Sequence, residues 1–194
     1  MLQVGVTGGI GSGKSLVCRI FQSMGVPIYE ADARARELTN CDPEIRRNIT
    51  EVFGVHSYTQ DGLNRQLMAQ EVFNNQEKLD RLNGIIHPVV GKDYKDWCHL
   101  HATNKVVIKE AAILFESGSY KSCDKVILVN APESIRLSRV VERDGVSEEE
   151  VKQRMANQWS SEKKMELADF LIMNDGSQAL IPQVIKVYKT LLEL

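Results

Sequence analysis

The chain has 194 residues, a formal net charge of −2 and 43% hydrophobic residues, a composition typical of a globular protein with one sizeable core. It has no excess of basic residues, so we expect no nucleic-acid partner. Its four cysteines are widely spaced without a C-x-x-C pair, which argues against a zinc site and a disulfide framework. The sequence shows neither a signal-peptide pattern nor an apolar run of about 20 residues, so we expect a cytoplasmic protein without a membrane partner.

Short runs of β-branched residues predict the strands of a sheet. We expect strands at 2–6, 105–109 and 125–129, and weaker ones at 26–29 and 170–173. The segments between them have helical patterns, and the strands are continuously apolar, as in a parallel sheet that is covered on both faces. The predicted fold class is therefore α/β.

The first strand leads into GGIGSGKS, which matches the pattern G-x-x-x-x-G-K-[ST]. A helix is expected from about Lys14 to Met24, so the motif lies between a strand and a helix, as a phosphate-binding loop does. Backbone N–H groups of such a loop point at phosphate oxygens, the lysine reaches the β- and γ-phosphates, and the hydroxyl of Ser15 can bind Mg²⁺. The loop residues are Gly8, Gly9, Ile10, Gly11, Ser12, Gly13, Lys14 and Ser15. They predict binding of a nucleoside triphosphate.

Asp32 follows the second predicted strand and precedes a helical pattern. The carboxyl ends of parallel strands line the ligand crevice, so this carboxylate could accept the proton of an attacking hydroxyl. The alternative is that Asp32 is the N-cap of its helix, a position that suits aspartate. The residue alone does not decide between the two interpretations.

The interval 40–104 is polar, has no convincing strand and shows helical spacing, so we expect a mostly helical insertion. Within it, His87 precedes Pro88, and proline disfavours the helical conformation of the residue before it. We therefore expect a helix to end at this pair.

Two glutamates follow the strand predicted at 105–109. Glu110 stands directly beyond it, where a carboxylate can orient Mg²⁺ or its water shell, and Glu116 is a weaker candidate. The alternative for Glu110 is a solvated residue at the start of a helix.

The stretch 136–167 predicts a helical hairpin, with a turn at Asp144-Gly145 and an N-cap at Ser147. Its basic residues could form a lid that closes over the triphosphate and neutralises charge. The alternative is a solvated helix face whose bases pair with neighbouring glutamates. The bases are Arg136, Arg139, Arg143, Arg154, Lys163 and Lys164.

A last helix is expected at 178–193. Its predicted core face consists of Ile181, Val184, Ile185, Tyr188 and Leu192.

P-loops occur in kinases, GTPases, motors and sensors, so the loop alone does not define a reaction. The chain lacks the N-K-x-D motif that reads guanine in GTPases, and it is short for a motor. A small-molecule kinase is the hypothesis that remains. A nucleoside monophosphate kinase and a nucleotide-binding module without transfer activity are its alternatives.

Nearly the whole chain resembles the dephospho-coenzyme A kinase family. The resemblance depends on VTGGIGSGKS at the start, on Ala31-Asp32 followed by ARARELT, and on LNGIIHPVV at 82–90. It continues through 113–145, then through Gln158, Lys164 and ADFLIMNDGS at 168–177.

The resemblance implies a P-loop kinase fold of the nucleotide-kinase type, with a five-stranded parallel sheet flanked by helices. It further implies a nucleotide-binding core formed by 1–39, 105–135 and 168–194, a CoA-binding helical insertion at 40–104 and a lid at 136–167. The implied reaction is ATP-dependent phosphorylation of the 3′-hydroxyl of dephospho-CoA, with Mg²⁺ as cofactor and no obligatory protein partner.

By the same resemblance, Asp32 is the catalytic base and acts with Lys14 and Arg139. Gly11 to Leu16 and Arg143 hold the triphosphate, and Asn174 lies near the adenine. The acceptor side is implied to consist of Asp32, His87, Pro88 and Glu110.

The sequence departs from the family pattern at four positions. Glu30 stands where the family has Asp, and Leu16 replaces a frequent Thr. Glu110 and Ala112 replace the Asp and Pro of the usual D-x-P-L-L-F-E. The Asp32 carboxylate and the Ser15 hydroxyl are both retained, so the implied reaction is unaffected.

Overall fold

The structure is a computed structural model that describes residues 1–73 and 75–194. Its chain divides into two compact units, of which the first combines Met1–Glu30 with His101–Leu194 and the second is Ala31–Leu100. The second unit begins earlier than the insertion expected at 40–104. The reason is that the helix after the second strand packs against two other helices of that unit.

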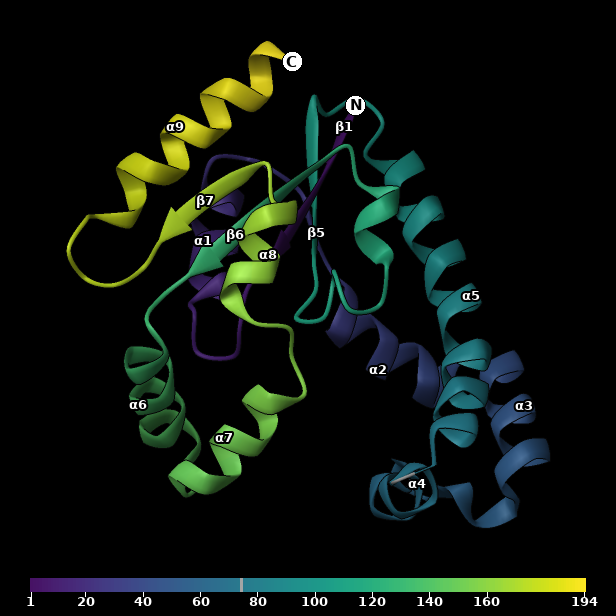
Figure 1. The fold of residues 1–194 in the computed structure, drawn as a ribbon. Helices are drawn as coiled ribbons and strands as arrows, with labels where there is room; N and C mark the ends of the chain where they lie inside the picture. Colours follow the sequence, from purple (N-terminus) through teal and green to yellow (C-terminus); the bar gives the residue numbers. More distant parts are fainter. Residues whose placement is uncertain (74) are drawn as a thin grey trace. The chain divides into compact units, whose positions relative to one another are not determined.

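A five-stranded sheet forms the centre of the first unit (Figure 1). The strands lie in the order β2-β5-β1-β6-β7 and each adjacent pair is parallel. Their bounds are β1 Leu2–Thr7, β2 Ile28–Glu30, β5 Val106–Glu110, β6 Lys125–Asn130 and β7 Phe170–Met173. The predicted five-stranded parallel α/β fold is confirmed.

The pairing register brings the ends of the central strands to one edge of the sheet. Val6 near the end of β1 and Glu30 at the end of β2 both pair with Glu110 at the end of β5. The segments that follow these strands therefore leave the sheet at the same edge, which is where ligands bind in open parallel sheets.

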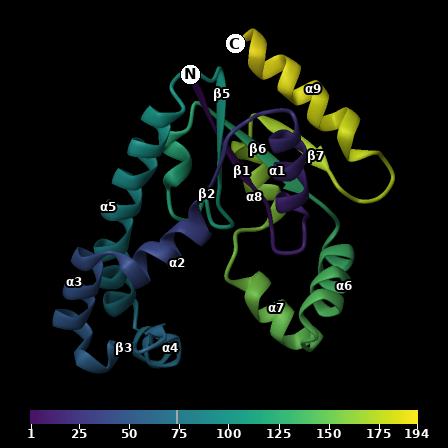
Figure 2. The ribbon, with the colours of Figure 1, turned by 180° about the vertical axis from the view of Figure 1, so that it is seen from behind.

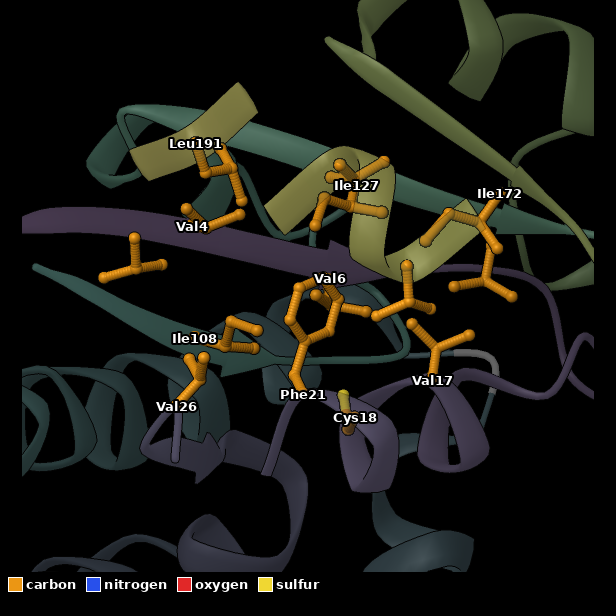
Figure 3. Close-up of a cluster of buried hydrophobic side chains, with 14 residues drawn as sticks. Val4, Val6, Val17, Cys18, Phe21, Val26, Ile108, Ile127, Ile172 and Leu191 are labelled. Carbon is orange, nitrogen blue, oxygen red and sulfur yellow. The ribbon is translucent and has the colours of Figure 1, made fainter. Parts of the chain in front are cut away.

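Apolar side chains between the sheet and two helices form the main core (Figure 3). The helices are α1 (Lys14–Ser23) and α9 (Leu180–Glu193). Helix α8 (Ser161–Leu167) contacts β6 from the opposite face; it lies in front of the sheet in Figure 1, whereas α1 lies in front of it in Figure 2. A short 3-10 turn, Ser119–Ser122, precedes β6. Fully buried Phe21, Ile108 and Ile127 show that this layer excludes water.

The predicted core face of helix α9 is confirmed in part. Val184 is buried and Tyr188 packs against the core, as expected. Ile181, Ile185 and Leu192 are exposed, and Val187 and Leu191 are buried in their place. The helix has apolar residues on more than one side, so periodicity alone placed the core stripe only approximately. Within residues 1–73 and 75–194, no helix has the length and apolar character needed to cross a bilayer.

The predicted helical hairpin consists of α6 (Glu133–Asp144) and α7 (Glu148–Ala156). Gly145 ends α6 with a φ of 65°, a left-handed conformation that glycine adopts without strain. Ser147 caps α7, because its side chain accepts a hydrogen bond from the Glu150 amide. The turn and the cap are confirmed.

The second unit is mostly helical. It contains α2 (Ala31–Cys41), α3 (Pro43–Phe53), a 3-10 turn (Val55–Ser57), α4 (Arg65–Val72) and α5 (Gln76–Leu100). Its core includes buried Leu38, Ile45, Ile49 and Met68. A hairpin of β3 (Tyr58–Thr59) and β4 (Gly62–Leu63) was not predicted, because strands of two residues are shorter than any sequence pattern.

The expectation that a helix ends at His87-Pro88 is wrong, since α5 continues through Pro88. Proline removes one helical N–H and brings its ring against the carbonyl group four residues earlier, which here belongs to Gly84. Apolar residues on both sides of it, among them Ile85 and Val89, pack onto the core of the second unit. Tertiary packing therefore offsets the local cost.

We predict opposite effects for two glycine substitutions in the second unit. A Cβ would meet no atom within 4 Å at either Gly91, inside α5, or Gly54, whose φ is +89°. Gly91→Ala should raise the free energy of unfolding by about 0.5–1 kcal/mol through helix propensity. Gly54→Ala should lower it by about 1 kcal/mol or more through backbone strain. Urea unfolding followed by circular dichroism measures both, and equal shifts of the same sign would contradict the argument.

Candidate functional site

The glycine loop connects β1 to α1. Gly11 and Gly13 have φ angles of 79° and 94°, so the chain uses the left-handed region twice within three residues. The Ser12 amide donates to the Gly9 carbonyl over 3.0 Å, which closes the first turn of the loop. The α1 helix then begins at Lys14 with its positive end at the loop.

Close contacts explain why glycine occupies the first half of the loop. A Cβ on Gly9 would lie 2.4 Å from Nη1 of Arg136, and one on Gly11 would lie 2.4 Å from the Arg136 carbonyl oxygen. The Arg136 side chain is itself buried and donates through Nε to the Ala131 carbonyl. Arg136 thus lies against the back of the loop as part of its support, and is not a solvated base on a helix face.

Three side chains from distant segments bind backbone atoms of the loop. Gln158, after α7, accepts a hydrogen bond from the Ile10 amide at 2.9 Å. Asn174, after β7, donates to the Ser12 carbonyl at 2.8 Å. Arg139 of α6 lies with Nη1 3.5 Å from the Gly11 carbonyl oxygen. Because C=O and N–H point in opposite directions in a trans peptide, binding the Ser12 carbonyl from outside directs the Gly13 amide the other way.

Lys14 and Glu110 meet at the ends of α1 and β5. Their Nζ and Oε1 atoms are 3.6 Å apart, with side chains only 12% and 13% exposed. This contact rules out the alternative of a solvated Glu110 at a helix start. It also places a carboxylate beside the lysine that is expected to reach a triphosphate.

Cys18 lies one helical turn after Lys14, on the buried side of α1. Burial raises the pKa of the Cys18 thiol to about 12, and the negative charge of Glu110 acts in the same direction. The thiol therefore stays neutral beneath the loop.

A buried ion pair connects α8 to the segment after β5. Lys164 Nζ lies 2.8 Å from Glu116 Oε1, and the lysine side chain is 1% exposed. The same carboxylate oxygen accepts the Trp159 amide at 2.9 Å. The sequence gives no sign of this pairing, because 48 positions separate the two residues and no short-range pattern relates them.

The two remaining arginines of the predicted lid, Arg143 and Arg154, bind a carboxylate and not the loop. Arg143 donates to both carboxylate oxygens of Asp144 through Nε and Nη2. These bonds, more than the nearby charge of Arg154, hold the pKa of Asp144 below its usual value. In the structure as it stands, Arg143 and Arg154 neutralise Asp144 at the far end of α6.

The remaining predicted site residues belong to the second unit. Helix α2 begins at Ala31, so Asp32 lies inside its first turn and is not the N-cap that the alternative interpretation required. His87 and Pro88 are exposed on the surface of α5.

Oxygen atoms are available for a divalent cation beside the loop. The exposed hydroxyl of Ser15 stands in the first turn of α1, and the Glu110 carboxylate lies next to Lys14. Hydroxyl and carboxylate oxygens are hard ligands of the kind that Mg²⁺ prefers, so the donor set fits this ion.

A family model, curated relatives and a solved structure carry the same family description. A family model described as dephospho-CoA kinase matches residues 2–179. A Chlorobium chlorochromatii dephospho-CoA kinase is 46% identical over 99% of this chain and 94% of its own. A crystal structure of TT1252 from Thermus thermophilus has a TM-score of 0.83 at 32% identity, covering 97% of this chain and 96% of its own. The structure of a Campylobacter jejuni dephospho-CoA kinase has a TM-score of 0.71 at 29% identity, covering 98% of this chain and 97% of its own.

The thiol environments predict selective labelling. At about pH 8, a thiol-specific alkylating reagent should label exposed Cys41 and leave buried Cys18 unmodified, because a raised pKa removes the reactive thiolate. Peptide mass spectrometry of the native protein measures the ratio, and the same treatment in urea is the control that should label both. Equal labelling of the two residues in the native protein would contradict the environment described for Cys18.

Proposed function

Because the chain belongs to the dephospho-CoA kinase family, we propose that it transfers the γ-phosphoryl group of ATP to the ribose 3′-hydroxyl of dephospho-CoA, giving coenzyme A and ADP, the last step of coenzyme A synthesis. The match of the family model to residues 2–179 is the observation that carries this proposal. The loop geometry supports it, since the loop offers amides, a helix N-terminus and a lysine to phosphate oxygens.

On the donor side, we assign the triphosphate to the amides of Gly11, Gly13, Lys14 and Ser15 and to the Lys14 side chain. Ile10, Ser12 and Leu16 are also expected to bind ATP, but in this structure their amides donate to Gln158, Gly9 and Gly13. Arg139 beside the Gly11 carbonyl is close enough to the loop to neutralise charge that develops on the transferring group. Arg143 would reach the nucleotide only after leaving Asp144.

We assign the nucleotide's Mg²⁺ to the Ser15 hydroxyl. When bound, the ion supplies positive charge to the β- and γ-phosphate oxygens. Glu110 is placed to accept hydrogen bonds in the same region while it pairs with Lys14. Its carboxylate also restrains the Lys14 ammonium group at the end of β5, so that the group is preorganised for a phosphate.

We assign the proton acceptor to Asp32. It stands two residues beyond Glu30, which the β2–β5 register holds beside Glu110. A carboxylate at this point in the chain can orient the 3′-hydroxyl and take its proton as the phosphoryl group is transferred.

The second unit offers a place for the remainder of the acceptor. A pocket of about 210 Å³ there is lined by Ala35, Arg36, Thr39, Asn40, Leu63, Arg65 and Ile86. The two arginines suit a diphosphate, and the apolar side chains of Ala35, Leu63 and Ile86 suit an uncharged arm of the same molecule. This combination supports the assignment of the unit, with His87 and Pro88, to acceptor binding.

An acceptor panel tests the proposal. The protein is incubated with ATP, Mg²⁺ and either dephospho-CoA or one of several nucleoside monophosphates, and ADP and acceptor mass are followed. Phosphate should appear on dephospho-CoA. Transfer to a nucleoside monophosphate alone would favour a nucleotide kinase, and ATP binding without any transfer would favour a binding module.

We further predict that Asp32→Asn lowers kcat by about 100-fold or more, because the isosteric amide cannot accept the proton. The Kd for ATP should stay within about twofold of the wild-type value, since the loop is unchanged. Glu37→Gln is the matched control, because Glu37 is an exposed carboxylate on the same helix. Unchanged turnover in Asp32→Asn would refute the assignment of the base.

A further inference from the structure

The connection between α7 and α8 is bound to the phosphate loop through Gln158. The side chain accepts the Ile10 amide at 2.9 Å, although the two residues are separated by 148 positions in sequence. The backbone N–H of Gln158 in turn donates to the Met155 carbonyl near the end of α7. This amide side chain therefore joins the loop to the end of α7.

This bond completes the restraint of one peptide group. The Gly9 carbonyl accepts the Ser12 amide, and the Ile10 amide, which belongs to the same peptide, donates to Gln158. A peptide held at both ends cannot rotate without breaking two hydrogen bonds. Its orientation determines where the following amides, from Gly11 onward, point.

The Glu116–Lys164 pair holds the residues on either side of this contact. Glu116 accepts the Trp159 amide, next in sequence to Gln158, and pairs with Lys164 in α8. Its own backbone is anchored by Leu114 and Phe115, which are 0% and 1% exposed. The pair thus connects a rigid segment after β5 to the backbone that carries Gln158.

The Glu116–Lys164 pair is better suited to positioning the backbone near Gln158 than to raising the stability of the fold. Within the part of the chain that the structure describes, Glu116 Oε2 and Lys164 Nζ are buried and make no hydrogen bond to protein atoms beyond the ionic contact. Buried ion pairs with incomplete hydrogen bonding contribute little net stability, because desolvation opposes their attraction. A cavity of about 450 Å³ also borders Gly9, Gln158 and Lys164, so close packing does not hold this side of the connection.

We propose that Gln158 is a positioning residue for the phosphate loop and that the Glu116–Lys164 pair acts through it by fixing the α7–α8 connection. The inference rests on the proposed function only in taking ATP as the ligand of the loop. It assigns a purpose to three residues that neither the phosphates nor the acceptor are expected to touch.

The first test removes the side-chain contact alone. Gln158→Ala should make the Ile10 amide exchange faster with solvent. It should also weaken ATP binding about tenfold, because the loop loses one of the hydrogen bonds that hold it in the binding conformation. The melting temperature and the KM for dephospho-CoA should stay at the wild-type values. Gln153→Ala is the matched control, because Gln153 is an exposed glutamine on α7. Wild-type ATP affinity in Gln158→Ala would overturn the proposal.

The second test asks whether the ion pair acts through Gln158. Glu116→Met with Lys164→Met should weaken ATP binding. Adding Gln158→Ala should cause little further loss, because the double substitution and Gln158→Ala disrupt the same contact between Gln158 and the loop. Full additivity of the two losses would overturn the role of the pair.

A second ion pair in the first unit provides the control for general loosening. Asp169 pairs with Lys125 at 2.9 Å and accepts the Val126 amide, so it combines the same kinds of contact away from the loop. Asp169→Leu with Lys125→Met should leave ATP affinity unchanged. An equal loss of affinity in this control would show that the effect is not specific to the loop and would overturn the proposal.

Calorimetric titration with ATP and Mg²⁺ in the absence of acceptor supplies the affinities, so the outcome does not depend on which acceptor is phosphorylated. If the wild-type protein binds ATP but does not phosphorylate dephospho-CoA, the proposed function is refuted and this inference is not. ATP affinity that is insensitive to Gln158 would refute this inference alone.

Discussion

The structure depends on one constraint, namely that a loop which turns its amides toward an anion must have its remaining backbone groups bound from elsewhere. The carbonyls of Gly11 and Ser12 face Arg139 and Asn174, and the Ile10 amide faces Gln158. Buried or half-buried peptide groups without partners are costly, so these contacts decide which orientation of each peptide is stable. The second half of the chain therefore shapes a loop that belongs to its first fifteen residues.

The same constraint explains the composition of the loop. Gly11 and Gly13 provide backbone angles that other residues avoid, whereas Gly9 provides room for the Arg136 guanidinium. Arg136 needs that room because its Nε donates a hydrogen bond to the carbonyl of Ala131, two residues before α6. The glycines are thus required by the phosphate-binding geometry and, separately, by the protein atoms packed behind it.

Sequence reasoning succeeded where the determining interactions are local. The strand at 170–173 and the cap at Ser147 follow from neighbouring residues, and both are found. It failed at Pro88, where packing of α5 outweighs a local preference, and it missed the contacts of Gln158, whose partner is 148 residues away. The loop pattern predicts that a phosphate binds. It contains no information on the side chains that orient the loop, because the topology of the sheet brings them to the loop from distant positions in the sequence.

The two ion pairs near the loop have different consequences for a nucleotide. Lys14 and Glu110 are 3.6 Å apart, beyond hydrogen-bond distance, so the ammonium group retains donors for phosphate oxygens while the carboxylate limits its motion. Lys164 and Glu116 are at 2.8 Å and the lysine is fully buried, so this charge is neutralised within the protein. Two lysines within one unit thus differ in function because of geometry and burial. In the proposed assignment, Lys14 binds the nucleotide, and Lys164 helps to hold the backbone that positions the loop around it.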